Sequence, residues 1–248
     1  LQAALPIAML IGGVVAAVFG VVIGIPALRL RGDYLAILTL GFGEIIRVMA
    51  NAEIFRPITN GAMGLSVETF SNRTEPGVMF AFAFVVMALV IFISYTFGRS
   101  RHGRSVISIR EDEIAAEAMG VNTVYYKLFA FVLAAFIAGI AGALYAHHVG
   151  MIDPSKFDFN RSVEILIMVV LGGMGSISGS VISATVLTIL PVVLRGCSDY
   201  LMLLYSVILI FVMLFRPSGL LGRYEISLPG LADKLLHRKR KAAKTEEG

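Results

Sequence analysis

The sequence predicts an all-α polytopic membrane protein, and three observations carry that prediction. Hydrophobic residues make up 57% of the 248 residues and charged residues only 15%, whereas a soluble domain carries about 25% charged residues. The mean hydropathy of +0.84 comes from apolar blocks that short polar stretches separate. No long hydrophilic stretch is present that could fold as a soluble domain, so we expect one integral unit.

Seven apolar segments are long enough to span or partly span a bilayer. An apolar helix of about 20 residues rises roughly 30 Å, which is the thickness of the hydrocarbon core. The first segment is a span and not a secretory signal, because no basic stretch precedes it and it is too long. The chain opens with Leu1, and we expect further helices before it. The segments are 5–28, 33–50, 77–97, 128–149, 162–174, 179–195 and 200–215.

The placement of Lys and Arg predicts the orientation. With 98–127 and the tail on the cytoplasmic side, 15 of the 21 basic residues lie inside and five lie outside, as the positive-inside rule requires. Seven crossings that start outside also end inside. A re-entrant 162–174 is the competing topology, and it would put the basic tail outside. We therefore expect a transmembrane permease domain over 1–222 and a basic cytoplasmic tail over 223–248 that can touch membrane lipid.

Two of the segments are short and broken by glycine. Segment 33–50 carries a glycine pair followed by a glutamate and an arginine, and segment 162–174 runs into a glycine cluster. The two segments lie in opposite halves of the chain, a pattern typical of inverted-repeat transporters with a pathway between the repeats. We therefore hypothesise an inverted repeat with a translocation path lined by Gly41, Gly43, Glu44, Arg47, Glu164, Gly172, Gly173 and Gly175.

The acidic residues of these segments leave two interpretations open. Glu44 and Arg47 are three residues apart, so on a helix they can form an ion pair. An ionisable residue at membrane depth usually faces the bundle interior or a cavity, which favours a polar lining of the path. The alternative is a self-neutralised pair near the outer headgroups. Glu164, three residues after Arg161, has the same two interpretations.

Several other classes of function find no support in the sequence. The glycine cluster 172–179 is not a phosphate loop, because no Gly-Lys pair occurs in the chain. The single cysteine, Cys197, excludes a disulfide framework or a cysteine-built metal site. No catalytic cluster or metal site appears, so we expect no enzyme activity. The net charge of +4 reflects loop charge bias and not nucleic-acid binding.

The polar stretch 99–127 lies between two uncharged apolar segments and is the most specific feature of the chain. Its residues from Ser108 to about Met119 favour a helix, and Gly120 suits the left-handed stop of a helix. Small residues there would let another surface approach closely. We interpret 98–127 as a cytoplasmic coupling loop, while a merely solvated charged helix is the alternative. The predicted docking residues are Arg110, Glu111, Asp112, Glu113, Ala115, Ala116, Glu117 and Gly120.

This loop resembles the EAA loop of ABC-importer permeases, in which two alanines are followed after three residues by a glycine, here Ala115, Ala116 and Gly120. The chain departs from that pattern at the leading glutamate, where Ile114 stands. Four stretches together resemble the branched-chain amino acid permeases of ABC importers, LivM type. They are 29–47 (RLRGDYLAILTLGFGEIIR), 59–65 (TNGAMGL), 110–120 (REDEIAAEAMG) and 159–179 (FNRSVEILIMVVLGGMGSISG).

The resemblance implies a permease subunit of an ATP-driven importer for leucine, isoleucine and valine in a bacterial inner membrane. It implies four kinds of partner: a LivH-like second permease, two cytoplasmic ATPase subunits, a periplasmic Leu/Ile/Val-binding protein and membrane lipid. ATP and Mg²⁺ would bind the ATPase subunits, and this chain would hold no cofactor. The alternative functions are an importer or a passive channel for another small polar solute, such as urea or a short amide.

Overall fold

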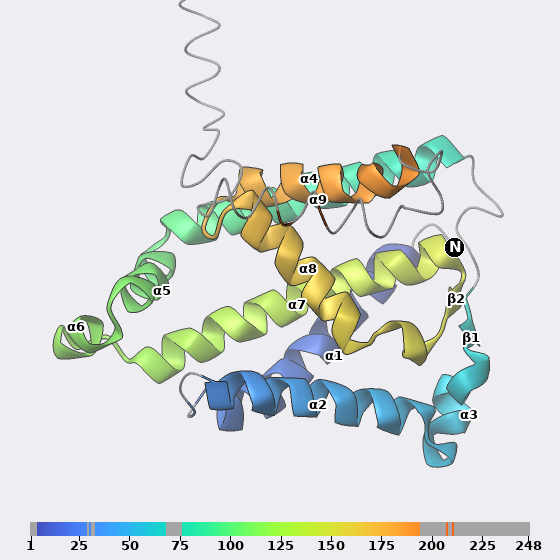
Figure 1. Cartoon of the computed structure of the whole chain (residues 1–248), viewed down its shortest axis with the longest axis horizontal. Helices are drawn as coiled ribbons and strands as arrows, with labels where there is room; N and C mark the ends of the chain where they lie inside the picture. The colour runs from blue at the N-terminus through green and yellow to red at the C-terminus, as the bar shows by residue number, and fades with distance from the viewer. Residues whose placement is uncertain are drawn as a thin grey trace, which may run out of the picture. The chain divides into compact units, whose positions relative to one another are not determined.

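The structure is a computed structural model, which describes residues 4–28, 30, 33–67, 76–193, 207 and 210 (Figure 1). Apart from the two last positions, the predicted segment 200–215 lies outside the described residues, as does the whole basic tail 223–248. The chain divides into two units, Leu1–Arg161 and Ser162–Gly248, which are described separately.

Three helices are long and apolar enough to cross a membrane: α1 (Ala4–Ala27), α4 (Pro76–Arg99) and α7 (Thr123–Val149). The 24 residues of α1 extend over about 36 Å at 1.5 Å per residue. Helix α7 begins where the Asn122 side chain accepts a hydrogen bond from the Tyr125 backbone N–H, and it ends at Gly150 in the left-handed conformation. These helices confirm the spans predicted at 5–28, 77–97 and 128–149.

Helices α1 and α7 pack together through small residues. Helix α1 carries a small residue every four positions at Gly12, Ala16, Gly20 and Gly24, which places all of them on one face. A Cβ on Gly139 of α7 would overlap the Gly12 carbonyl and lie 2.7 Å from the Ala16 Cβ. The two backbones therefore touch. Such close approach of small residues is the usual way in which helices associate inside a bilayer.

The connection after α2 (Asp33–Asn51) pairs with the segment that follows α7. It contains η1 (Glu53–Phe55), α3 (Arg56–Thr59), η2 (Gly61–Met63) and β1 (Leu65–Ser66), and β1 pairs antiparallel with β2 (Met151–Ile152). The Thr59 hydroxyl donates to the Ala50 carbonyl at 2.7 Å, and the Asn60 amide donates to the Gly64 carbonyl at 2.9 Å. The turn-rich stretch 59–65 thus ties the end of α2 to this small sheet.

The short helix η4 (Pro154–Lys156) follows β2 and contacts α2. Asp153 caps it: the Ser155 backbone N–H donates to Asp153 Oδ1 at 2.8 Å. This hydrogen bond, with a further one from the Ser155 side chain, lowers the pKa of the Asp153 carboxyl. The two hydrogen bonds therefore favour the ionised carboxylate, which is the form that caps the helix.

The second unit holds a pair of helices joined by a tight turn. Helix α8 (Phe159–Gly172) enters this unit at Ser162, and α9 (Ile177–Val193) follows after four residues. Gly173 and Gly175 have φ values of 110° and 100°, which favour glycine. A Cβ on Gly172 would lie 2.5 Å from the Gly179 carbonyl, so the two helices meet backbone to backbone. The predicted segment 162–174 is therefore a short helix that ends in a glycine turn.

Most large apolar side chains of α1 and α4 are exposed in this chain, and few are buried. In a soluble protein such exposed apolar surface would promote aggregation. In a membrane protein these surfaces can face lipid or a partner subunit. With three spanning helices and nearly all described residues in helices, the protein is an all-α, multi-pass membrane protein. The expected fold class is confirmed.

Candidate functional site

The central loop consists of two helices, where the sequence predicted one helix over 108–119. Helix α5 spans Arg101–Glu111 and α6 spans Glu113–Ala118. Asp112 separates the two helices because its backbone is extended, with φ −153° and ψ 109°. Its side-chain Oδ1 accepts hydrogen bonds from the backbone N–H groups of Ile114 and Ala115 at 2.9 and 3.0 Å. Asp112 is thus the N-cap of a new helix, a position that aspartate favours, and the prediction of a single helix was wrong.

The base of the loop is held against the ends of α4 and α7. The Ser100 hydroxyl accepts a hydrogen bond from the Gly103 backbone N–H at 3.0 Å and so caps α5. Gly103 is buried against the last turn of α4, where a Cβ would overlap the Phe97 carbonyl. The His102 ring lies 6.0 Å from the Tyr126 ring and 5.9 Å from the Phe129 ring, both on α7. Helix α5 therefore contacts both spans that frame it.

Helix α6 is joined to the N-terminal part of α7 and to the segment just before it. Glu113 and Lys127 form an ion pair at 2.7 Å, and both side chains are about two-thirds buried, with 31% and 30% exposed. The Val121 backbone N–H donates to the Ala116 carbonyl at 3.0 Å, and the Ala116 side chain is buried. A partly buried pair is screened less than an exposed one. An ion pair thus joins α6 to α7, and a backbone hydrogen bond joins α6 to the segment between the two helices.

The predicted docking residues do not all share one surface. Arg110, Glu111, Asp112, Ala115, Glu117 and Gly120 are exposed, Glu113 is half-buried, and Ala116 is buried. Ala115 and Ala116 separate in this way because neighbouring residues on a helix point about 100° apart. Gly120 has a φ of 83°, and a Cβ placed there would meet nothing within 4 Å. It stops α6 as predicted and leaves the surface beside it open.

Two exposed residues of this loop, Ile114 and Met119, were absent from the predicted docking residues. Their side chains are 77% and 85% exposed. The available signal was the presence of two large apolar residues in an otherwise polar stretch. Ile114 lies in the first turn of α6, and Met119 is the residue after its end.

Helix α2 carries the other predicted site. The Arg47 guanidinium Nε donates to both Glu44 carboxylate oxygens at 3.1 and 3.0 Å, and a second guanidinium nitrogen contacts the same carboxylate. The predicted ion pair is therefore present. The Asn51 amide donates to the Arg47 carbonyl at 3.1 Å. A Cβ on Gly41 or Gly43 would meet nothing within 4 Å. The two glycines lie about 200° apart around the helix, so α2 is open on two opposite sides there.

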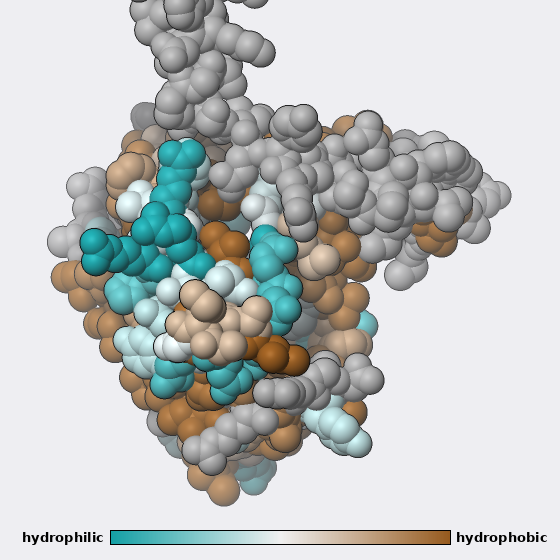
Figure 2. All heavy atoms as spheres, turned by 90° about the vertical axis from the view of Figure 1, so that its left-hand side faces the viewer, coloured by the Kyte–Doolittle hydropathy of each residue, from teal (hydrophilic) through white to brown (hydrophobic). Residues whose placement is uncertain are grey.

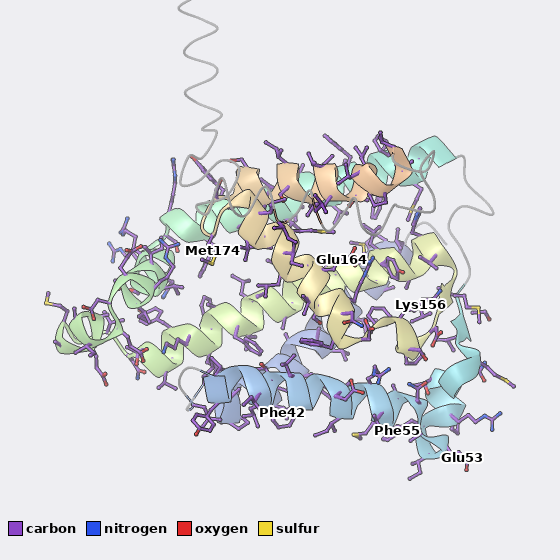
Figure 3. The ribbon with its side chains drawn as sticks, in the orientation of Figure 1. Phe42, Glu53, Phe55, Lys156, Glu164 and Met174 are labelled. Atoms are coloured by element: carbon purple, nitrogen blue, oxygen red, sulfur yellow. The ribbon has the colours of Figure 1, made fainter. Side chains whose placement is uncertain are left out.

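The remaining predicted path residues belong to the second unit. Glu164 extends from the first half of α8, and Met174 lies in the glycine turn after it (Figure 3). Gly172 and Gly173 are buried, and Gly175 is exposed. Because α2 lies in the first unit, a path that joins the two sets of residues stays a prediction. Among the described residues, no cluster of three or more His, Cys, Asp or Glu could hold a metal ion.

Comparisons with known proteins place the chain in a family. Residues 1–215 match the family described as "Branched-chain amino acid transport system / permease component". The chain is 37% identical over 241 residues to the high-affinity branched-chain amino acid transport system permease protein LivM of Escherichia coli K12, covering 85% of this chain and 56% of that protein. It thus spans little more than half the length of this relative.

Two further relatives extend the comparison. The permease protein LivH of Salmonella typhimurium is 34% identical over 166 residues, covering 65% of this chain and 52% of that protein. A probable LivM of Methanocaldococcus jannaschii is 22% identical over 249 residues, covering 93% and 72%. No solved structure shows a significant match. The predicted resemblance is confirmed, and the chain belongs to the branched-chain amino acid transport permease family.

Proposed function

We propose that the protein is a permease subunit of an ATP-driven importer for leucine, isoleucine and valine, and that it moves its substrate without chemical change. The observation that carries the proposal is the α5–α6 loop, whose exposed tip is fastened to α7 by the Glu113–Lys127 pair. The family match and the printed names of the relatives support the substrate class.

The geometry supports a specific mechanical sequence. A cytoplasmic ATPase subunit displaces α6 when ATP closes the ATPase pair. Because Glu113 of α6 pairs with Lys127 of α7, a displacement of α6 is passed on to α7. Helix α1 then moves together with α7, because the two backbones are in contact at Gly12 and Gly139. The small side chains at this crossing leave no gap in which one helix could move without the other. The α1–α7 pair then moves as one body, and this motion alternates access between the two sides of the membrane.

Partners complete the importer. A LivH-like second permease, two ATPase subunits that bind ATP and Mg²⁺, and a periplasmic binding protein would surround this chain in a bacterial inner membrane. The C-terminus would be cytoplasmic, as the distribution of Lys and Arg predicts. Gly41, Gly43 and Glu44 are candidates for the path lining, because neighbouring residues of this chain leave the space beside both glycines unfilled.

The deciding experiment is uptake of radiolabelled leucine at low concentration in cells that lack the gene. We expect that restoring the full-length gene restores uptake, that ATP depletion abolishes it, and that isoleucine and valine compete. Restored uptake that survives ATP depletion would favour a passive channel. No effect on leucine, together with an effect on urea or a short amide, would keep the permease and change its substrate.

A further inference from the structure

A groove lies where α5 meets the end of α1 and the start of α7. Its volume is about 340 Å³, near the lower end of the range of about 300–1,000 Å³ for ligand pockets, and it is open to the outside. Helices α5 and α7 each contribute three residues at positions i, i+3 and i+4, so each helix turns one face to the groove. The lining residues are Leu28, Val106, Ile109, Arg110, Lys127, Ala130 and Phe131.

The lining combines an apolar floor with two cations. Five of the seven lining residues are apolar, and the other two are Arg110 and Lys127. Each cation has a carboxylate partner at 2.7 Å, Glu111 for Arg110 and Glu113 for Lys127. The pair of Arg110 is exposed, with 53% and 54% of its side chains accessible, and exposed pairs contribute little in water. A guanidinium has five N–H donors, and Glu111 engages one of its nitrogens, so Arg110 can bind a further oxyanion.

The groove lies at the boundary between the apolar spans and the polar loop. Leu28 directly follows α1, and Lys127 is the last charged residue before the stretch 128–149, which contains no Asp, Glu, Lys or Arg. Phospholipid headgroups meet the hydrocarbon core at this level of a membrane protein. The adjoining part of the loop is basic, because Arg99 to Arg110 contains four arginines and no acid. Figure 2 views the end that carries α5 and α6, where hydrophilic residues gather beside hydrophobic ones.

We propose that this groove binds one anionic phospholipid from the leaflet that meets this end of α1 and α7. An acyl chain would lie against Val106, Ile109 and Phe131, and the phosphate would contact Arg110. Apolar surface favours the chain, and cations between membrane helices favour an anionic headgroup. An apolar helix of another subunit would cover the floor but would bury the two cations against apolar side chains, which is costly. A lipid satisfies both parts of the lining.

The inference goes beyond the proposed function, because it requires neither an ATPase nor an amino acid substrate. The test uses the full-length protein, purified with the subunits that accompany it and reconstituted in phosphatidylcholine vesicles. Photoactivatable phosphatidylglycerol and phosphatidylcholine with the same labelled acyl chain are compared, and the cross-linked peptides are mapped. We expect both 106–110 and 127–131 to be labelled at least about fivefold more by phosphatidylglycerol, since each cation near an anionic lipid contributes about that factor.

Arg110→Gln tests the headgroup contact. It should lower the labelling by phosphatidylglycerol about fivefold and leave the labelling by phosphatidylcholine unchanged, because it removes one cation and keeps the apolar floor. The matched control is Arg101→Gln on the same helix. Arg101 is exposed, does not line the groove and lies nine residues from Arg110, which places it on the opposite side of α5. Arg101→Gln should leave the labelling of the groove unchanged.

Ala130→Leu tests the acyl-chain contact. The larger side chain takes up part of the groove, so labelling by both lipids should fall. The matched control is Ala138→Leu, because Ala138 is exposed and lies about 12 Å further along α7. Thermal unfolding in detergent without added lipid should be the same for both variants, which separates loss of the lipid from loss of the fold.

Three results would overturn the inference. Labelling that misses both groove peptides while other surfaces of the protein are labelled would show that no lipid binds there. Equal labelling by the two lipids would remove the anionic headgroup from the site. Labelling of the isolated chain that disappears when the other subunits are present would show that a subunit, and not a lipid, fills the groove. None of these results bears on ATP-dependent leucine uptake, so the proposed function is tested separately.

Discussion

The glycines of α2 and those of the turn between α8 and α9 differ in what surrounds them. A Cβ on Gly172 would lie 2.5 Å from the Gly179 carbonyl, whereas a Cβ on Gly41 or Gly43 would meet nothing. Packing within the chain therefore explains why Gly172 is glycine, and no role in transport is needed to account for it. The α2 glycines have no such explanation, so a substrate path or a partner helix is the better account of them.

The crossing of α1 and α7 is the strongest case of packed glycine, and Gly139→Leu should have the largest effect. The new side chain would overlap the Gly12 backbone and Ala16. Overpacking typically costs about 1–3 kcal/mol, and a backbone clash lies at the upper end. We expect the free energy of unfolding to fall by about 3 kcal/mol, read from thermal unfolding in detergent. The control is Gly142→Leu on the same helix, where a Cβ meets nothing within 4 Å; equal stability of the two variants would contradict the tight crossing.

The comparison of the two glycine regions can be made with a single methyl group. Gly172→Ala should lower stability by about 1–3 kcal/mol, because its Cβ meets the Gly179 backbone. Gly43→Ala should raise stability by about 0.5–1 kcal/mol, since alanine is the better helix former and space is open. Chemical unfolding of both variants measures the difference. A loss of stability in Gly43→Ala would show that its helix face is packed after all.

Substitutions at the two open glycines of α2 should affect transport and leave stability unchanged. We expect Gly41→Leu and Gly43→Leu to lower leucine uptake while the protein unfolds at the same temperature as its parent, because the bulk enters space that this chain leaves open. Uptake by cells and thermal unfolding of the purified protein provide the two readouts. Normal uptake in both variants would remove these glycines from the path.

Glu44, on the same helix, allows a finer test of the path. Glu44→Gln should impair uptake without stimulating ATP hydrolysis if Glu44 lines the path. It also leaves the Arg47 charge without its carboxylate partner, so the double variant Glu44→Gln/Arg47→Gln is the control. Recovery of uptake in the double variant would mean that the pair only neutralises itself. Unchanged uptake in the single variant would favour the location near the outer headgroups.

Hydropathy and residue spacing predicted the three spanning helices and the Glu44–Arg47 pair, because both depend on residues close in sequence. The break at Asp112 was missed because aspartate also fits a solvated helical turn, and its role as a cap depends on the backbone conformation. The burial of Ala116 and the contact of Gly12 with Gly139 depend on which helices pack together. The spacing of small residues in α1 was a visible signal, but it does not identify α7 as the partner.

The central claim is that the loop couples ATP hydrolysis to transport, and Gly120→Asp tests it most directly. Gly120 has a φ of 83° with open space around it, and aspartate tolerates this conformation better than most residues, so the chain should still fold. Leucine uptake and ATP hydrolysis would be measured together in proteoliposomes of the complete importer. We predict that uptake is lost while ATP hydrolysis continues, because the side chain blocks close approach of the ATPase. Normal uptake at the normal ratio of ATP hydrolysed to leucine transported would contradict the account.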